Sequence, residues 1–490
     1  MEQDIFIGVD VGTQGARVLA TDHTGTSIAD FALGWALNRG RDGRHEQNPD
    51  VWLKSVIHAI GEVASRIDTH RVAGVAVTAT SGTLVVTDAS GVPLRPAIMW
   101  DDTRAGHEAG ALASATADLS EHTGLRMRPS YPLPKLAWLE TNEPDVFEQA
   151  VWALHQSDWL LWKLAGCVGR PVTDPTNAMK TGYDPVANEW VSVLGDHGWE
   201  QLLPRVVDAG SAVWEISQEN ARSTGLPVGT ALVTAMTDAN TASLGAGLTQ
   251  VGEWSSTLGT GLSVKGRVMD PLADASAGVY SHAHPFGGWL ASGTAHTGGG
   301  VVTQCFGSDQ NELARLAVEA ETIDIGDSLN YPLAGRGEFF PFWAPEATGF
   351  VVGTPRGRAG EFRAVLEGVA VVERLVFDRF VQIGAPIAET VTVLGGATRS
   401  PLWNTIRANM LGRPLTVRTR ADTVLGACIT VAVSSGIPAK TAIRDMVAPG
   451  TNVYPDPALS DQFGALVETY LDEFQRRGYL NSVPLKEGLK

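Results

Sequence analysis

The sequence predicts an α/β protein built from two domains, and three observations support this prediction. The chain has 490 residues, of which 44% are apolar, so it is long for one core and can fill two. Short apolar and β-branched runs alternate with segments of helical periodicity, which is typical of α/β layers. A turn rich in glycine and threonine lies beside apolar runs early in each half. We therefore expect two similar domains, at residues 1–248 and 249–490, that face each other across a cleft.

The composition excludes several classes of protein. The net charge of −17 argues against a surface that binds nucleic acid or an anionic membrane. No apolar run reaches the roughly 18 residues that a membrane helix needs. The three cysteines are widely spaced and form no Cys-x-x-Cys pair, which excludes a disulfide scaffold and a zinc site made of cysteines. These features predict a cytoplasmic protein without nucleic-acid or membrane partners.

The first expected element is a β-hairpin at residues 5–20. Its first strand carries Asp10 near its end, and Gly12, Thr13 and Gln14 follow in the turn. Exposed backbone N–H groups in such a turn can bind phosphate, and a carboxylate beside them can bind a divalent cation. An ordinary hairpin without a ligand is the alternative interpretation of this segment alone.

A helix and two strands are expected next. Asn48 is a good N-cap and Pro49 suits the first helical position. Apolar residues then recur at steps of three and four, so one face of the helix is buried (Trp52, Val56, Ile60, Val63 and Ile67). The β-branched runs at residues 72–78 and 83–87 predict the two strands.

An apolar strand that begins at Ala231 is expected to end on Asp238, with small residues after it. A carboxylate in this place can reach a cleft and act as a general base. Most aspartates before a helix are only N-caps, which is the alternative interpretation here.

Two further elements belong to the second half. Gly259, Thr260 and Gly261 form a turn like the first one. A strand at residues 391–394 runs into Gly395 and Gly396, which let a flat ring or a ribose phosphate approach the backbone. A helix is then expected from Pro401 to Gly412. Neither turn is a P-loop, so phosphate binding would depend on backbone amides, hydroxyls and a metal.

Together these elements resemble the FGGY carbohydrate kinases in order and spacing over residues 5–440. The segment from Ser130 to Asn142, with Lys135 and Trp138, is similar to the Lys-x-x-Trp signature of that family. The resemblance implies two actin-like domains of ribonuclease H type that close over ATP, Mg²⁺ and a sugar. Such an enzyme transfers the γ-phosphate of ATP to a hydroxyl of the sugar.

The resemblance also implies roles for individual residues. Asp238 would be the general base, and Asp10 would help to place Mg²⁺ through water. The implied contacts with ATP are at Gly12, Thr13, Gln14, Gly259, Thr260, Gly300, Gln304, Gly395, Gly396 and Asn404. The implied contacts with the sugar are at Ser81, Gly82, Trp100, Asp101 and Asp238. Trp100 would stack on an apolar sugar face or belong to the core, and Asp101, Asp102 and Arg104 would bind sugar hydroxyls or form a surface ion pair.

The identity of the sugar is less constrained. Xylulokinases typically have Met-His, and glycerol kinases Arg-Glu, where Ser81 and Gly82 stand in this chain. The Thr-Ser-Gly-Thr run is more similar to that of xylulokinase-like D-ribulose kinases. Ser81 leaves room and one hydrogen bond for an uncharged polyhydroxy substrate. We therefore expect a ketopentose, D-ribulose or D-xylulose.

Alternatives to this function remain open. One alternative substrate is an alditol, and another is a sugar acid. A sugar-acid kinase is expected to have a cation near Ser81, and none is apparent in the sequence, although Arg104, Arg126 or Arg128 could reach in. A catalytically silent, sugar-sensing ATP-binding regulator is a third, which the presence of Asp10 and Asp238 disfavours. The sequence also leaves open a homodimer, the hydroxyl that is phosphorylated and the nucleotide preference.

Overall fold

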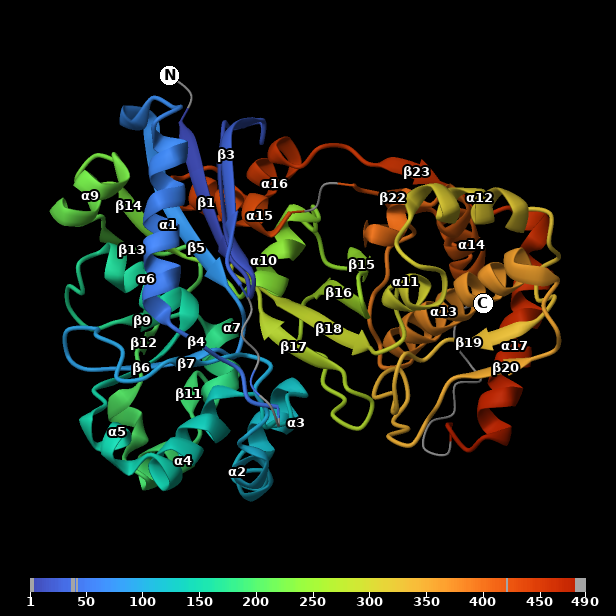
Figure 1. Cartoon of the computed structure of the whole chain (residues 1–490), viewed down its shortest axis with the longest axis horizontal. Helices are drawn as coiled ribbons and strands as arrows, with labels where there is room; N and C mark the ends of the chain where they lie inside the picture. Colours follow the sequence, from blue (N-terminus) through green and yellow to red (C-terminus); the bar gives the residue numbers. More distant parts are fainter. Residues whose placement is uncertain (1–3, 37–39, 41–42, 420–421, 481–490) are drawn as a thin grey trace. The chain divides into compact units, whose positions relative to one another are not determined.

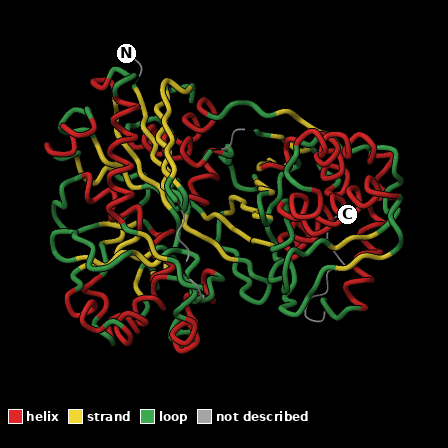
Figure 2. Tube along the Cα trace, viewed as in Figure 1, coloured by secondary structure: helices red, strands yellow, loops and turns green. Residues whose placement is uncertain are grey.

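The computed structural model describes residues 4–36, 40, 43–419 and 422–480, and the chain divides into two compact units (Figure 1). Helices and strands alternate in both units (Figure 2). The units are not continuous in sequence: unit 1 is Met1–Thr249, His282–Gly288 and Ala421–Ala448, and unit 2 is Gln250–Ser281, Trp289–Arg420 and Pro449–Lys490. They differ in this respect from the linear division expected at residues 248 and 249.

Unit 1 is built on a six-stranded sheet with the order β13-β14-β5-β1-β2-β3. The expected hairpin is confirmed, because β1 (Ile5–Val11) pairs antiparallel with β2 (Gly15–Thr21). β3 (Ser27–Gly34) extends the sheet antiparallel beside β2. On the other side of β1, β5 (Val72–Ala79) and β14 (Ala231–Thr234) are parallel, and β13 (Ala212–Glu215) forms an antiparallel edge.

Helices cover both faces of this sheet. On one face, Ile5, Ile7 and Val9 pack in one core with residues of α1 (Pro49–Ala64) and α6 (Gln156–Leu164). Alternate side chains point to the other face, where Phe6 packs with α15 (Thr423–Ser434) and with α10 (Asp238–Gly245). The α15 backbone lies so near β1 that a Cβ atom on Gly8 would stand 2.3 Å from the Val424 carbonyl oxygen.

The membership of α15 in unit 1 has a physical reason. All of its residues from Val424 to Ala432 are buried, and Ala427, Cys428 and Ile429 belong to the same core as Phe6. A helix that is apolar all round must be covered on several sides. The strands of unit 1 provide that cover, although α15 is distant from them in sequence.

A smaller four-stranded sheet in unit 1 has the order β4-β7-β6-β8, with bounds Glu46–Gln47, Ala97–Ile98, Leu84–Thr87 and Trp152–His155. α4 (Pro132–Asn142) shares a core with its residues. The remaining helices of unit 1 are α2 (Gly106–Ala111), α3 (Ala117–Thr123), α5 (Pro144–Gln149), α7 (Pro175–Ala178), α8 (Ser192–Asp196), α9 (Gln218–Thr224) and α16 (Ala439–Met446). The remaining strands pair as β9 (Val172–Thr173) with β12 (Arg205–Val206), and β10 (Tyr183–Asp184) with β11 (Glu189–Trp190).

Unit 2 repeats the strand pattern of unit 1 in a seven-stranded sheet, β17-β18-β16-β15-β21-β22-β23. β15 (Trp254–Leu258) and β16 (Leu262–Val268) form an antiparallel hairpin, which β18 (Trp289–Ala295) extends. β21 (Val391–Gly395) and β22 (Leu415–Val417) are parallel on the other side of β15. Both units thus have a hairpin, a third antiparallel strand and two parallel strands, which is the ribonuclease H-like arrangement.

The helices of unit 2 are α11 (Gly300–Phe306), α12 (Gln310–Ala320), α13 (Gly357–Gln382), α14 (Pro401–Leu411) and α17 (Ser460–Arg476). Its other strands are β19 (Leu329–Tyr331), β20 (Phe350–Val352), β23 (Thr451–Val453) and the first two residues of β17 (Tyr280–Ala283), whose last two residues are assigned to unit 1. No helix in the described part of the chain is both long enough and apolar enough to cross a membrane.

Local sequence signals located several of these elements correctly. The Asn48 side chain accepts a hydrogen bond from the Asp50 N–H at the start of α1, although α1 ends at Ala64 and Ile67 lies beyond it. The Ser400 hydroxyl accepts a hydrogen bond from the Trp403 N–H at the start of α14. α14 ends at Leu411, before Gly412 with φ +61°.

Candidate active site

The turn of the first hairpin is closed by a hydrogen bond from the Gly12 N–H to the Gly15 carbonyl, at 2.9 Å. Gly12 and Thr13 are partly buried, and Gln14 is exposed. The Thr13 carbonyl oxygen accepts hydrogen bonds from Trp35 Nε1 at 3.0 Å and Gln47 Nε2 at 2.9 Å. Side chains outside the hairpin therefore hold this turn in place.

Carboxylates gather around Asp10, near the end of β1. The pKa of Asp10 is raised to about 7, mainly by burial and in addition by the charges of Asp238 and Asp422, while the charge of Arg17 opposes this shift. Arg17 forms an ion pair with Asp422, which immediately precedes α15. Among the described residues, no group of three His, Cys, Asp or Glu side chains is arranged to bind a metal directly. A Mg²⁺ ion that keeps most of its water suits this arrangement, because such an ion needs few protein ligands and offsets the negative charge.

Asp238 is the first residue of α10, and β14 ends earlier, at Thr234. The expectation that the strand itself ends on Asp238 is therefore wrong by four residues. The Asp238 side chain is partly buried, and its Oδ1 accepts a hydrogen bond from the Ala239 N–H at 2.6 Å. It thus lies at the start of a helix and at the end of a short turn.

Buried hydroxyls hold the turn that leads to Asp238. The Met236 carbonyl accepts hydrogen bonds from the Thr78 and Thr241 hydroxyls, each at 2.8 Å. The Thr237 N–H donates to the Thr176 hydroxyl oxygen at 3.0 Å. That hydroxyl donates in turn to the buried carboxylate of Asp174. This network fixes the backbone immediately before Asp238.

Two loops of unit 1 carry the residues expected to bind the sugar. We call residues 80–83, between β5 and β6, loop A, and residues 99–105, between β7 and α2, loop B. The buried Lys135 ammonium connects them, because Nζ donates to the Gly82 carbonyl at 2.8 Å and to the Met99 carbonyl at 2.6 Å. Burial lowers the pKa of Lys135 to about 7. Lys135 of the Lys-x-x-Trp signature is therefore a structural link between loops A and B.

Ser81 in loop A has a buried hydroxyl oxygen that makes no hydrogen bond with the described residues. Such an atom fits a hydroxyl group of a ligand, because a buried polar atom without a partner is unfavourable. The Ser81 carbonyl accepts a hydrogen bond from Lys180 Nζ at 3.2 Å.

The expectation that no cation lies near Ser81 is therefore wrong. The Lys180 ammonium lies 5.0 Å from the centre of the Tyr131 ring. Burial lowers the pKa of Lys180 to about 8, while the charge of Asp238 opposes this shift and that of Arg128 adds to it. Lys180 was missed because it is almost 100 residues from Ser81 in sequence and belongs to no signature.

Loop B is held by charged groups. Asp102 and Arg104 form a buried ion pair at 2.7 Å, and Arg104 also pairs with Glu46. The interpretation of this pair as a surface ion pair is therefore wrong. Asp101 Oδ1 lies 2.6 Å from His45 Nδ1. Trp100 is 42% exposed, so it is not a core residue.

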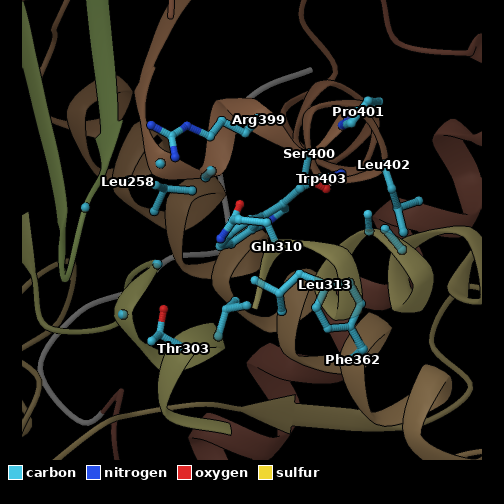
Figure 3. Close-up of a pocket in the computed structure, with 18 of the residues that line it drawn as sticks. Leu258, Thr303, Gln310, Leu313, Phe362, Arg399, Ser400, Pro401, Leu402 and Trp403 are labelled. Carbon is cyan, nitrogen blue, oxygen red and sulfur yellow. Dashed lines mark hydrogen bonds between the residues drawn. The ribbon is translucent and has the colours of Figure 1, made fainter. Parts of the chain in front are cut away.

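Unit 2 contains a pocket of about 510 Å³ (Figure 3). The turn residues Gly259 and Thr260 line it together with Gly300 and Gly396. Its apolar wall comes from α12, α13 and α14, through Leu313, Ala314, Ala317, Phe362, Leu402 and Trp403. Thr303, Gln310 and Arg399 are polar residues that also line it. A flat, largely apolar ligand with a polar end fits this composition.

Close backbone contacts explain the glycines of this pocket. A Cβ atom on Gly299 would lie 2.7 Å from the Gly259 carbonyl oxygen, and one on Gly300 would lie 3.0 Å from that of Thr260. The two segments can approach this closely because neither glycine has a side chain.

Three residues of unit 2 that were expected near ATP are not among the described residues that line this pocket. Gln304 is exposed on α11, and Gly395 lies against β15, where a Cβ atom would stand 2.3 Å from the Leu258 carbonyl oxygen. Asn404 is buried, and its Nδ2 donates to the Thr398 carbonyl at 2.9 Å. The α12 wall was missed, because its pattern of apolar residues indicates only a helix with one buried face.

Two family models match the chain. The N-terminal domain of the FGGY family of carbohydrate kinases matches residues 5–245, and the C-terminal domain of that family matches residues 255–435. The chain belongs to the FGGY family of carbohydrate kinases. It is therefore an ATP-dependent sugar phosphotransferase, and the resemblance seen in its sequence is confirmed.

Known members of the FGGY family are similar to this kinase along most of its length. Glycerol kinase 2 of Streptomyces avermitilis is 30% identical over 474 residues, which cover 89% of each chain. Gluconokinase of Bacillus subtilis is 23% identical over 469 residues, which cover 90% of each chain. The crystal structure of xylulose kinase from Lactobacillus acidophilus has a TM-score of 0.87 at 21% identity, over 98% of this chain and 99% of that one. The two actin-like, ribonuclease H-like domains expected for an FGGY kinase are thereby confirmed, whereas the names of these relatives indicate different substrates.

Proposed function

We propose that this kinase transfers the γ-phosphate of ATP to a hydroxyl of a ketopentose, D-ribulose or D-xylulose, with Asp238 as general base. The observation that carries the proposal is the unpartnered buried hydroxyl of Ser81 in loop A. The Lys180 ammonium contacts the Ser81 carbonyl and interacts electrostatically with Asp238. A polyhydroxy substrate at loop A would therefore be near the proposed base.

The chain's own groups would contribute positioning and charge. Asp238 would accept the proton of the attacking hydroxyl. The hydrogen bonds that the backbone groups of Met236 and Thr237 make would hold Asp238 in place. Lys180 would offset negative charge close to Asp238. Phosphoryl transfer depends mainly on such positioning and electrostatic stabilisation, because the protein performs little covalent chemistry.

ATP is proposed to bind with its adenosine in the pocket of unit 2. The apolar wall from α12, α13 and α14 would contact the base. The turns at Gly12–Thr13 and Gly259–Thr260 would bind phosphate oxygens through the hydroxyl and N–H groups of Thr13 and Thr260, because the N–H groups of Gly12 and Gly259 already donate to the Gly15 and Gly261 carbonyls. Mg²⁺ would be held near Asp10 through water and would neutralise phosphate charge. Four further ATP contacts remain predictions, at Gln14, Gln304, Gly395 and Asn404. The cytoplasmic location and the homodimer also remain predictions.

A sugar acid is the second candidate substrate, and Lys180 is the observation that favours it. An ammonium near loop A is able to bind a carboxylate, and this removes the argument that no cation is available there. Arg104 is not available in the same way, because Asp102 and Glu46 already bind it. A variant of Lys180 can therefore distinguish a neutral sugar substrate from an acidic one.

The experiment is sugar-dependent ADP release with ATP and Mg²⁺. The panel contains D-ribulose, D-xylulose, L-ribulose, glycerol, erythritol, ribitol, xylitol and gluconate. We expect turnover on one ketopentose and a loss of at least about 100-fold in kcat for Asp238→Asn, because the variant cannot accept the proton. Asp270→Asn is the matched control, since Asp270 is exposed in unit 2.

The outcomes separate the candidates. In one outcome, the wild type turns over gluconate, and Lys180→Met raises KM for gluconate and changes the kinetics with neutral sugars little. That result would replace the ketopentose by a sugar acid as the proposed substrate. Full activity of Asp238→Asn would exclude Asp238 as the base. No turnover on any substrate of the panel would overturn the ketopentose assignment.

A further inference from the structure

Three N–H donors from separate parts of unit 1 converge on Thr13. Trp35 and Gln47 donate to its carbonyl oxygen, and Trp100 Nε1 donates to its hydroxyl oxygen at 2.8 Å. Trp35 follows β3, Gln47 belongs to β4, and Trp100 belongs to loop B. Thr13 is therefore fixed through both its backbone and its side chain.

The bond between Trp100 and Thr13 has a defined direction. An indole N–H can only donate a hydrogen bond, whereas a hydroxyl has one hydrogen and two lone pairs. The Thr13 oxygen must therefore accept from Trp100. The hydrogen of the Thr13 hydroxyl remains free to be donated to another acceptor.

Trp100 is in turn anchored within loops A and B. Its backbone N–H donates to the Thr83 hydroxyl oxygen of loop A at 3.2 Å. Lys135 Nζ donates to the preceding carbonyl, that of Met99. The position of the indole, and with it the Thr13 hydroxyl, thus depends on both loops.

A second series of hydrogen bonds connects loop B to the Thr13 carbonyl. Trp52 Nε1 donates to Gln47 Oε1 at 2.8 Å, which fixes the orientation of the Gln47 amide. Gln47 Nε2 then donates to the Thr13 carbonyl and, at 3.3 Å, to His45 Nε2. His45 Nδ1 therefore carries the hydrogen and donates to Asp101 in loop B. Every donor in this series of hydrogen bonds thus faces an acceptor.

We infer that Trp100 is a positioning residue that orients the Thr13 hydroxyl toward a phosphate oxygen and so links the sugar-binding loops to the phosphate-binding turn. This inference rests on the proposed function, which places the sugar at loops A and B and phosphate at Thr13. It gives Trp100 a role beyond stacking on the sugar. A stacking role would act on sugar affinity, whereas a positioning role acts on the transfer step.

The test is a double-mutant cycle measured with the preferred sugar. Trp100→Phe keeps an aromatic ring but has no N–H group, and we expect kcat to fall about tenfold while KM for the sugar changes less than about threefold. Thr13→Val removes the hydroxyl. In the Thr13→Val background we expect Trp100→Phe to lower kcat less than about twofold, because the interaction is already lost.

Thr13→Ser is the matched background, since it keeps the hydroxyl, and there Trp100→Phe should again lower kcat about tenfold. Trp343→Phe controls for the loss of an indole, because Trp343 is 41% exposed and belongs to unit 2. Urea unfolding of every variant identifies any that is not folded. The affinity for an ATP analogue, measured across the same double-mutant cycle, is the second readout.

Equal effects of Trp100→Phe in all three backgrounds, or an effect on KM for the sugar alone, would overturn the inference and leave the proposed function intact. A wild-type protein without sugar-dependent turnover would overturn the proposed function and the inference with it.

Discussion

Lys135 shows how a signature residue obtains its role from surroundings that the signature does not contain. Its ammonium is buried and donates to one carbonyl in loop A and one in loop B. The sequence identified the residue through its Lys-x-x-Trp spacing but gave it no contact. Its acceptors lie 53 and 36 residues earlier in the chain, so local pattern could not reveal them.

Lys135 should make the stability of the protein dependent on pH. Its pKa is about 7 in the folded protein and 10.5 ordinarily, so between these values the unfolded chain binds more protons. Stability of the wild type should therefore rise with pH, by up to about 1.4 kcal/mol per pH unit, relative to Lys135→Met. Urea unfolding at pH 7.0, 8.0 and 9.0 measures this difference.

The exposed Lys54→Met in α1 is the control and should show no such pH-dependent difference. Identical pH profiles for the wild type and Lys135→Met would show that Lys135 keeps its proton when folded. Lys135→Met should also raise KM for the sugar, because the carbonyls of Gly82 and Met99 would lose a donor.

Among the elements, the contact between α10 and α15 is unusually close. A Cβ atom on Gly426 would lie 2.1 Å from the Thr241 carbonyl oxygen, and one on Gly245 would lie 2.5 Å from that of Asp422. Each helix thus presents a glycine to the backbone of the other. α10 begins with Asp238, so this contact also supports the proposed base.

Gly426→Ala should therefore lower the free energy of unfolding by about 1 to 3 kcal/mol, because the added methyl group has no space. It should also lower kcat, since α10 must move. Gly464→Ala in α17 is the matched control: no atom would lie within 4 Å of its Cβ. The control should stabilise the protein by about 0.5 to 1 kcal/mol, because alanine favours a helix. Urea unfolding of both variants tests this pair, and equal effects would contradict the close contact.

Elements with local signals were predicted from the sequence, and those defined by distant contacts were not. The hairpin of β1 and β2, the N-cap of α1 and the end of α14 each depend on neighbouring residues, and each is found where expected. The start of α10 was misplaced, because an apolar run continues past the end of β14. The contact between α10 and α15 could not be predicted, since it joins residues that are 177 and 185 positions apart in the sequence (Gly245 with Asp422, and Thr241 with Gly426).

At the scale of the whole molecule, unit 1 depends on a segment late in the chain. α15 covers the face of the sheet that contains Phe6 and Gly8. Residues 1–249 alone would leave this apolar face in water, which costs about 25 cal/mol for each Å² exposed. We expect this fragment to show no cooperative urea transition.

A fusion of residues 1–249 to residues 421–448 through a glycine-serine linker should regain a cooperative transition, because it restores α15. Circular dichroism and urea unfolding of the two proteins make the comparison. If residues 1–249 alone unfold as cooperatively as the fusion, α15 is not needed for the fold of unit 1.

The late position of α15 also affects how the protein is made. A ribosome that has completed residue 249 must add about 200 more before α15 and α16 are available, which takes roughly 10 to 40 s at usual rates of synthesis. During that interval the nascent sheet has one face without its helix. Unit 1 therefore cannot finish folding as it emerges, and a chaperone that shields apolar surface would have time to bind there.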